Sequence, residues 1–322
     1  MTNKKYEFIN NYEQPIRLDV FLKEELVIGL NLSQYSRNQL AKTIKNKKVL
    51  INGKIAKKPS SLILKDDLIE VDLEKEDKTK ISYFDFPLNI VFEDDHIIVI
   101  DKPSNLVVHP GAGNPDNTLL NALAFYFKDQ KDIQIELVHR LDKDTSGLIA
   151  VSKNEESRIF LSNQFQDRSA SRTYLALCLL SSKSKSCFAL EDQGVIETFV
   201  GRNRNNRLKF SVTDKGKTAI THWKKIDRFN YAALIEFNLK TGRTHQIRVH
   251  SEYLKSPIIG DSLYGDFDLL PKKLLIESTR LGRQALHAKE LKLIHPVTKE
   301  EMIFKSDIPQ ELQDIIDQFK LF

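Results

Sequence analysis

One ten-residue segment offers the groups that acid–base or covalent chemistry requires. Residues 139–148 read His-Arg-Leu-Asp-Lys-Asp-Thr-Ser-Gly-Leu, with a carboxylate at Asp142, cations at Arg140 and Lys143, two hydroxyls and a flexible glycine. Apolar runs flank the segment, which predicts a loop held between rigid strands, a common place for a site. From these residues alone, an ion-paired turn is an equal alternative. A glycosidase pair of Asp142 and Asp144, which needs about 5–9 Å between carboxyls, is disfavoured, although the spacing does not fix that distance.

A second polar segment, Thr-Gly-Arg-Thr-His-Gln-Ile-Arg-Val-His, spans residues 241–250. Thr244 can cap a helix that presents Arg248 one turn from its start. His245 and His250 lie five residues apart, so they do not share a helix face as zinc ligands four residues apart would. Each histidine is expected to be a hydrogen-bonded polar residue, and no metal site is predicted.

Positive charge is concentrated in two stretches that contain no acidic residue. The net charge is +5, which indicates a polyanionic partner only weakly. Residues 198–213 hold a basic run expected to grip a phosphate backbone, with a solvated hairpin as the alternative: Arg202, Arg204, Arg207 and Lys209. Residues 37–59 hold eight basic side chains, which could also form a solvated lysine face: Arg37, Lys42, Lys45, Lys47, Lys48, Lys54, Lys57 and Lys58.

The composition of the chain and the motifs it lacks exclude several classes of protein. No run of eighteen apolar residues occurs, and the charged start has no apolar stretch after it, so a cytoplasmic protein without a membrane span is predicted. Cys178 and Cys187 are the only cysteines and are expected to be reduced and structural. A nucleotide loop of the GxGxxG type is absent, which argues against a methyltransferase. A phosphate-binding P-loop is excluded because Ser211 occupies the position of its first glycine.

The periodicity predicts a small domain at residues 15–75, followed by a linker at 76–85 within a charged stretch without aromatic residues. The small domain should contain a helix starting at 17, a helix at 37–47 capped by Ser36, and strands at 49–51 and 67–73. Asn52-Gly53 is a strong signal for a hairpin turn.

Residues 86–322 are predicted to form an α+β domain with a mixed, largely antiparallel sheet. Short apolar runs predict strands at 97–100, 137–141, 148–151, 174–180, 232–239 and 291–294. Helices are predicted at 118–127, 154–165, 244–254 and 309–319, with Thr118, Asn154 and Thr244 as N-caps.

Residues 16–73 resemble the alpha-L RNA-binding domain named for the fourth protein of the small ribosomal subunit. The resemblance rests on Ser36-Arg37-Asn38-Gln39-Leu40, Val49-Leu50-Ile51-Asn52-Gly53-Lys54, Pro59 and Asp67-Leu68-Ile69-Glu70-Val71. It implies binding to structured RNA through Arg37, Lys42, Lys45 and Lys48.

Most of residues 86–300 resemble pseudouridine synthases that act on large-subunit ribosomal RNA, the Rlu type. The motifs that carry the resemblance, in order, are Asp101-Lys102-Pro103, Val107–Gly111, His139–Leu148, Arg172–Ala176, Thr241–His250, Pro257–Asp261, Tyr264-Gly265, Arg283–Ala288 and His295–Thr298. Ordered motifs of this number are far more specific than any one of them. The form of the 142–147 loop and the Pro-Gly after His109 look most like the branch that modifies a helix-loop near the decoding region.

The resemblance implies a reaction that detaches uracil from its ribose at N1, turns the ring and rejoins it through C5, without a cofactor. It makes Asp142 the catalytic carboxylate, Arg248 its ion-pair partner, and Tyr174 the residue that stacks on uracil and takes part in C5 proton transfer. Arg140 would enter the space that a flipped nucleotide leaves. Whether Asp142 attacks the sugar, attacks the base or removes a sugar proton stays open.

Two departures from the family pattern concern the choice of substrate. Residues 251–256 lack the histidine that commonly precedes the family's proline, and residues 201–209 differ from the usual version of that loop. The expected partner is ribosomal RNA, as the large subunit or its precursor particle, with the protein acting as a monomer. A non-catalytic RNA-binding or ribosome-assembly factor is the competing hypothesis, disfavoured because Asp142, Tyr174 and Arg248 are all present.

Overall fold

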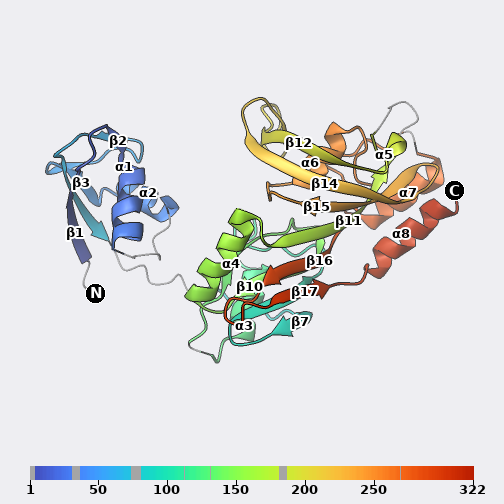
Figure 1. Cartoon of the computed structure of the whole chain (residues 1–322), viewed down its shortest axis with the longest axis horizontal. Helices are drawn as coiled ribbons and strands as arrows, with labels where there is room; N and C mark the ends of the chain where they lie inside the picture. The colour runs from blue at the N-terminus through green and yellow to red at the C-terminus, as the bar shows by residue number, and fades with distance from the viewer. Residues whose placement is uncertain are drawn as a thin grey trace. The chain divides into compact units, whose positions relative to one another are not determined.

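The computed structural model describes residues 4–30, 37–73, 81–111, 113–130, 132–180, 187–268 and 270–322. The chain folds as two compact units, Met1–Lys80 and Ile81–Phe322 (Figure 1).

The first unit combines a small antiparallel sheet with a helical layer. The sheet order is β1 (Lys4–Ile9), β6 (Leu68–Leu73), β3 (Val49–Ile51), β4 (Lys54–Ile55). A separate two-stranded sheet pairs β2 (Ile16–Arg17) with β5 (Leu62–Ile63). The helical elements are α1 (Leu18–Leu22), the π-helix η1 (Lys23–Gly29) and α2 (Arg37–Lys45).

Alternation along β6 explains how this unit closes its core. Ile69, Val71 and Leu73 are buried while the residues between them are not, and they pack with Leu40 and Ile44 of α2. Asn52 and Gly53 have φ values of 49° and 69°, the left-handed pair that a tight hairpin between β3 and β4 requires. The helix, strands and turn predicted here are therefore confirmed, although the proposed cap Ser36 lies outside the described residues.

The second unit is built on one long sheet. Among its described residues, the sheet order is β13, β12, β14, β15, β11, β16, β10, β8, β7, with β17 pairing β16 and β9 pairing β10. All these pairings are antiparallel except that of β10 with β16. The predicted α+β fold with a mixed, largely antiparallel sheet is thus confirmed. The strands are β7 (Ile90–Glu93), β8 (Ile97–Lys102), β9 (Glu136–Leu137), β10 (Ser146–Ser152), β11 (Ser171–Leu179), β12 (Gln193–Arg202), β13 (Phe210–Val212), β14 (Lys217–Arg228), β15 (Ala232–Leu239), β16 (Leu286–Ile294) and β17 (Glu301–Lys305).

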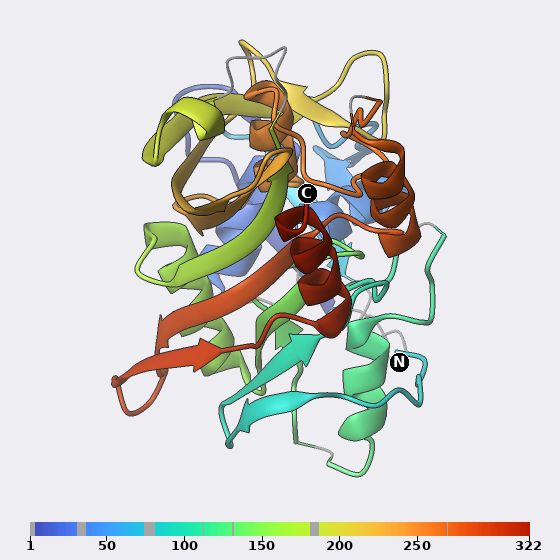
Figure 2. The ribbon, with the colours of Figure 1, turned by 90° about the vertical axis from the view of Figure 1, so that its right-hand side faces the viewer.

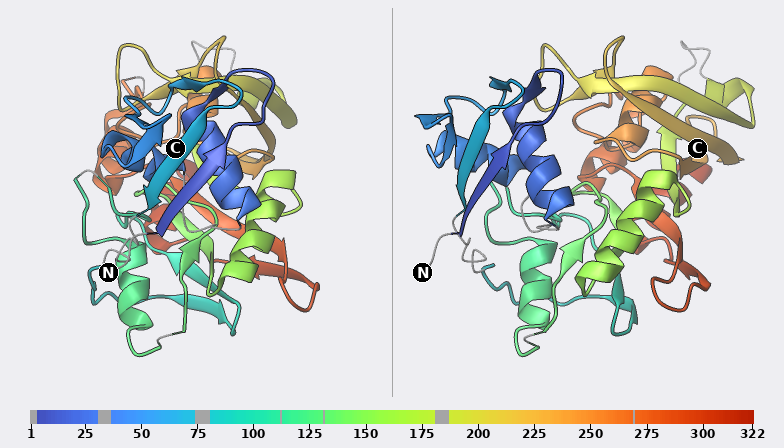
Figure 3. Two further views of the ribbon diagram at one scale, coloured as in Figure 1. Left: turned by 90° about the vertical axis from the view of Figure 1, so that its left-hand side faces the viewer. Right: turned by 60° about the vertical axis from the view of Figure 1, so that its left-hand side comes forward.

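The middle of this sheet is covered by helices on both faces. Figure 3 shows α3 (Leu119–Tyr126) and α4 (Glu155–Asp167) on either side of β10. Ile149 and Val151 pack in the cluster that contains α3, whereas Leu148 and Ala150 pack with Leu161 of α4. Burial on both faces explains why β8 and β10 are continuous apolar runs rather than alternating ones.

The C-terminal helix closes one face of the sheet beside β11 and β16. The remaining helices are α5 (Cys187–Leu190), α6 (Gln246–Tyr253), α7 (Lys272–Leu281) and α8 (Gln310–Lys320). Leu312 and Ile316 of α8 lie against Leu175 and Leu177 of β11, and the helix runs across this face in Figure 2. Neighbouring side chains along β11 point to opposite faces, so Tyr174 faces away from α8. None of the helices in the described ranges is long and apolar enough to cross a membrane.

The structure differs from the predicted elements at 137–141 and at 193–228. The strand predicted at 137–141 is only β9, Glu136–Leu137, because the chain leaves the sheet to form the loop that holds Asp142. The β12–β14 hairpin was missed because it is largely polar. Its few buried side chains, such as Ile196 and Trp223, do not make the apolar run that signals a strand.

Candidate active site

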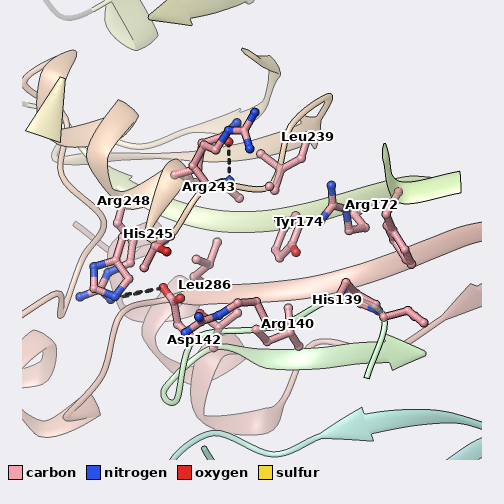
Figure 4. A pocket seen from close by; sticks show the side chains of 18 residues that line it. His139, Arg140, Asp142, Arg172, Tyr174, Leu239, Arg243, His245, Arg248 and Leu286 are labelled. Carbon is pink, nitrogen blue, oxygen red and sulfur yellow. Dashed lines mark hydrogen bonds and ion pairs between the residues drawn. The ribbon is translucent and has the colours of Figure 1, made fainter. Parts of the chain in front are cut away.

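A cleft of about 240 Å³ lies between the 138–145 loop, strand β11 and the segment that leads from β15 into α6. One water molecule occupies about 30 Å³ in liquid water, so the cleft has roughly eight times that volume, which is enough for a single pyrimidine. Figure 4 shows Asp142, His245 and Arg248 at one end of the cleft and Arg172 and His139 at the other, with Tyr174 between them. Three segments far apart in sequence therefore meet in one cavity.

The carboxylate of Asp142 is held by an arginine that is itself fixed by a second aspartate. Arg248 Nη1 lies 3.3 Å from Asp142 Oδ2, while its Nε and Nη2 donate to the two oxygens of Asp261 at 2.6 and 2.8 Å. Asp261 is fully buried and also accepts from the backbone N–H groups of Leu263 and Tyr264. Burial opposes the charge on Arg248, but the hydrogen bonds and charge of Asp261, with that of Asp142, raise its pKa. The guanidinium is thus permanently charged and rigidly placed.

Tyr174 forms the middle of the cleft. Tyr174 belongs to β11, where its neighbour Leu175 packs against α8 on the opposite face. The Tyr174 side chain is only 5% exposed. Burial raises the pKa of its hydroxyl, so the phenol is protonated at neutral pH. Leu286 of β16 also lines the cleft. A flat ring entering this space would meet an aromatic and an aliphatic surface.

His245 links the Asp142 end of the cleft to Tyr264. Its Nε2 lies 3.9 Å from Asp142 Oδ2, and its Nδ1 is 2.9 Å from the Tyr264 hydroxyl. That hydroxyl accepts a hydrogen bond from Phe210 N–H, which leaves its own proton for Nδ1. Burial lowers the pKa of His245, favouring the neutral ring, and this tautomer places the remaining proton on Nε2, toward Asp142.

The loop that carries Asp142 is anchored from two sides. The fully buried Lys102 ammonium donates to the carbonyls of Pro103, Leu106 and Lys143 at 2.7–3.0 Å. On the other side, Arg283 Nη1 donates to the Asp144 carbonyl at 3.1 Å. Burial lowers the pKa of Lys102 to about 7.

Gly147 allows the end of this loop to approach β16. Its φ of +110° is unfavourable for other residues, and a Cβ there would lie 2.3 Å from the Ala288 carbonyl oxygen. The Thr-Ser-Gly sequence after Asp144 therefore reflects a close parallel pairing of β10 with β16.

The helix that presents Arg248 begins later than the sequence suggested. Thr244 is not its cap: α6 starts at Gln246, and His245 precedes it with a left-handed φ of 56°. The Gln246 side chain accepts hydrogen bonds from Arg243 N–H and from the Thr241 hydroxyl, which satisfies the turn without a threonine cap. His250 is hydrogen-bonded to Thr198 and Thr221, so both histidines have the polar partners expected of them.

Comparison with known proteins identifies the family. Residues 96–253 match the family described as RNA pseudouridylate synthase, and residues 16–69 match the S4 domain. The chain is 40% identical over 301 residues to "Ribosomal large subunit pseudouridine synthase D" of Xanthomonas campestris pv. campestris, covering 92% of this chain and 88% of that protein. It is 38% identical over 291 residues to the protein of the same name from Salmonella typhimurium, covering 89% and 87%. The chain belongs to the RNA pseudouridylate synthase family.

The fold of the second unit agrees with this assignment. The structure titled "Human RNA Pseudouridylate Synthase Domain Containing 4" aligns with a TM-score of 0.57 and 22% identity, covering 72% of this chain and 93% of that one. "Human RNA Pseudouridylate Synthase Domain Containing 1" aligns with a TM-score of 0.53 and 21% identity, covering 73% and 96%. Both resemblances predicted from the motifs are therefore confirmed, and the protein is an RNA pseudouridine synthase with an N-terminal S4 domain.

The synthase brings the three predicted catalytic side chains and Arg140 into one cleft. Arg140 is exposed and lies beside Asp142 in Figure 4. Three exposed arginines lie at the end of β12 and in the loop that follows it: Arg202, Arg204 and Arg207. The Arg202 guanidinium lies 5.4 Å from the Phe210 ring centroid, and Phe210 in turn contacts His245, so this basic hairpin adjoins the Asp142 end.

In the S4 domain, the predicted lysines differ in their surroundings. Lys42 and Lys45 of α2 are exposed, whereas Lys48 is half-buried and pairs with Asp72 at 3.7 Å. The Arg37 side chain lies outside the described residues. In the second unit, Cys178 is buried and its burial raises the pKa of the thiol to about 12, as expected for a reduced structural cysteine; the Cys187 side chain lies outside the described residues.

Several functional candidates had no role assigned from the sequence. Asp261, Lys102, Tyr264 and Arg172 all lie within motifs that the sequence displays, but no spacing rule pairs them with Asp142 or Tyr174. Only the folded chain shows that Asp261 fixes Arg248 and that Arg172 lines the cleft. Among the described residues, no group of three or more histidine, cysteine or acidic side chains is arranged to hold a metal ion.

Proposed function

We propose that this synthase isomerises specific uridines of large-subunit ribosomal RNA in the cleft formed by Asp142, Tyr174 and Arg248. The observation that carries the proposal is the Asp142 carboxylate, 17% exposed at the cleft, held 3.3 Å from an arginine whose other nitrogens are occupied by buried Asp261. The names of the relatives, large-subunit synthases at 38–40% identity, support the choice of RNA.

The proposed reaction breaks the bond between uracil N1 and ribose C1′, turns the base and forms a bond from C5 to C1′. No atom is gained or lost overall, because C5 gives up one proton and N1 takes one up. Asp142 is the only carboxylate that lines the cleft among the described residues, so it is the proposed reacting group. Tyr174 is proposed to stack on the uracil and to relay the C5 proton through its hydroxyl, which gives up its own proton as it accepts that one.

Arg248 is the proposed ion-pair partner that keeps Asp142 ionised and oriented. Because two of its three nitrogens are committed to Asp261, it meets Asp142 through Nη1 alone. One carboxylate oxygen of Asp142 is then left for the substrate. This arrangement suits a group that must react rather than one that only stabilises the fold.

RNA binding is proposed to be shared between the units. Residues 15–75 would act as the RNA-binding domain through Arg37, Lys42, Lys45 and Lys48, joined by residues 76–85 to a catalytic domain at 86–322. Arg140 would fill the position of the flipped nucleotide, and Arg202, Arg204 and Arg207 would contact phosphates. We further propose that the synthase is monomeric and cytoplasmic.

The test is pseudouridine mapping of ribosomal RNA from cells with and without this gene, and with the Asp142→Asn variant. We expect sites in large-subunit RNA to disappear in the deletion and to stay absent with Asp142→Asn, while the purified variant binds RNA as the wild type does. Binding rests on many phosphate contacts, whereas turnover rests on one carboxylate. Pseudouridine formation by Asp142→Asn would overturn the assignment of the reacting group, and an unchanged map in the deletion would overturn the proposed substrate.

A further inference from the structure

The end of the cleft opposite Asp142 holds a buried arginine without a counter-ion. Arg172 lines the cleft two residues before Tyr174 on β11 and is 9% exposed. Among the described residues no carboxylate forms an ion pair with Arg172, and its Nε has no hydrogen-bond partner. Buried arginines in proteins are almost always paired, because removing the charge from water is costly.

A second buried donor without a partner lies at the same end. His139 lines the cleft, and its Nε2 accepts a hydrogen bond from Ala150 N–H at 2.9 Å. Burial lowers the pKa of His139 to about 3, so the ring is neutral and its one proton is on Nδ1. That Nδ1 is buried and has no partner. Two buried donors near one end of the cleft therefore lack an acceptor.

The surroundings fix both donors in place. The Phe165 ring of α4 packs against His139, with centroids 4.5 Å apart, and lies under the Arg172 guanidinium at 5.2 Å. On its other side Arg172 meets Gly242, where a Cβ would lie only 2.8 Å from Nη1. Gly242 thus leaves room for the guanidinium, which is placed by an aromatic ring rather than by a carboxylate.

We infer that Arg172, with His139 Nδ1–H, binds a backbone phosphate next to the everted uridine. A phosphodiester supplies the negative charge and the acceptors that both donors lack, and the planar guanidinium suits it. Tyr174 lies between this end and Asp142, so a uracil against Tyr174 would place its own sugar–phosphate within the same cleft (Figure 4). The inference rests on the proposed function and adds a phosphate subsite to it.

The test uses the full-length enzyme and a large-subunit RNA stem-loop that the wild type modifies, with the phosphate 5′ or 3′ of the target uridine replaced by a neutral methylphosphonate. We expect Arg172→Gln to weaken RNA binding or kcat/KM by about 10- to 100-fold on the native RNA. One of the two methylphosphonates should cause a similar loss in the wild type and little further loss in Arg172→Gln, because the two changes remove the same contact. Arg172→Lys and Gly242→Ala should give intermediate losses.

Arg280→Gln is the matched control, since this arginine has an 81% exposed side chain and does not line the cleft. A structural role for Arg172 would appear as a lower Tm of the free Arg172→Gln protein, whereas removal of an unpaired buried charge should leave Tm unchanged or raise it. Inorganic phosphate should raise the Tm of the wild type more than that of Arg172→Gln.

The phosphate subsite would be overturned if the loss from Arg172→Gln added in full to the loss from each of the two methylphosphonates. It would also be overturned if Arg172→Gln were as active as the wild type. If the wild type modifies no RNA, the proposed function fails, while the comparison with inorganic phosphate still tests the anion site on its own.

Discussion

The Asp261→Asn substitution tests whether the buried aspartate, rather than Asp142, fixes the arginine of the active site. Asp261 is fully buried and makes two hydrogen bonds of 2.6 and 2.8 Å to Arg248. An asparagine keeps the shape but removes the charge and turns an N–H₂ group toward a donor. Removing one partner of a buried ion pair typically costs about 3–5 kcal/mol, because the other charge stays buried. Arg248 keeps Asp142 as a counter-ion at 3.3 Å, so we expect about 3 kcal/mol.

For a unit of this size, roughly 2–4 °C of Tm is lost per kcal/mol, so calorimetry should show the larger unit unfolding about 6–12 °C lower. Arg248 should also swing toward Asp142, and a misplacement of about 1 Å can lower turnover about 100-fold. RNA affinity should hold, since phosphate contacts are untouched. Asp268→Asn, an exposed aspartate a few residues away, should change Tm by less than a degree or two. Wild-type stability or wild-type kcat in Asp261→Asn would refute the role of Asp261 as the residue that positions Arg248.

Three further outcomes follow from the same geometry. Gly147→Ala places a Cβ 2.3 Å from the Ala288 carbonyl at a φ of +110°, so urea unfolding should show a loss of more than about 2 kcal/mol, and an unchanged midpoint would contradict the close β10–β16 approach. Burial lowers the pKa of Lys102 from 10.5 to about 7, so between these pH values the unfolded chain binds more protons than the folded one. The free energy of unfolding should therefore rise with pH across that window. Lys102→Met should remove this rise, which chemical denaturation at several pH values would reveal. Each single replacement of Arg202, Arg204 or Arg207 with glutamine should reduce the slope of log binding constant against log salt concentration by about 1, and should leave kcat on saturating RNA unchanged. A salt-independent affinity would mean that the hairpin does not contact the RNA.

The sequence predicted best those parts of the fold whose residues contact close neighbours in the chain. The Asn52-Gly53 turn needs only its own backbone angles, and Thr118 caps α3 through a bond to Asn121 three residues on. Asn154 caps α4 in the same way. The cap of α6 failed because Gln246, rather than Thr244, supplies the local hydrogen bonds. A capping rule scores one residue type at one position and does not detect a side chain that folds back onto its own turn.

The candidate site was predictable in its residues but not in its connections. The motifs named Asp142, Tyr174 and Arg248, yet the contact between Asp142 and Arg248 joins residues 106 positions apart. Arg172 stood in a motif without a role, since an unpaired charge is visible only when its surroundings are known. The strand pattern of β11 does place Arg172 and Tyr174 on one face, because they are two residues apart. What that face encloses depends on α4, α6 and the 138–145 loop together.

Two of the arginines that line the cleft, Arg248 and Arg172, differ in how the fold pairs them, and the difference indicates what each does. Arg248 is saturated: Asp261 takes two of its nitrogens at 2.6 and 2.8 Å, and Asp142 receives only the third at 3.3 Å. A fold that needed Asp142 merely for stability would give it the shorter, two-point pair. Arg172 has no carboxylate partner among the described residues and is stabilised by the face of Phe165. The free enzyme leaves the Arg172 charge without a counter-ion, so this charge does not stabilise the fold. An anion that binds there forms the missing ion pair, and the free energy of that pair contributes to binding the RNA that carries the uridine.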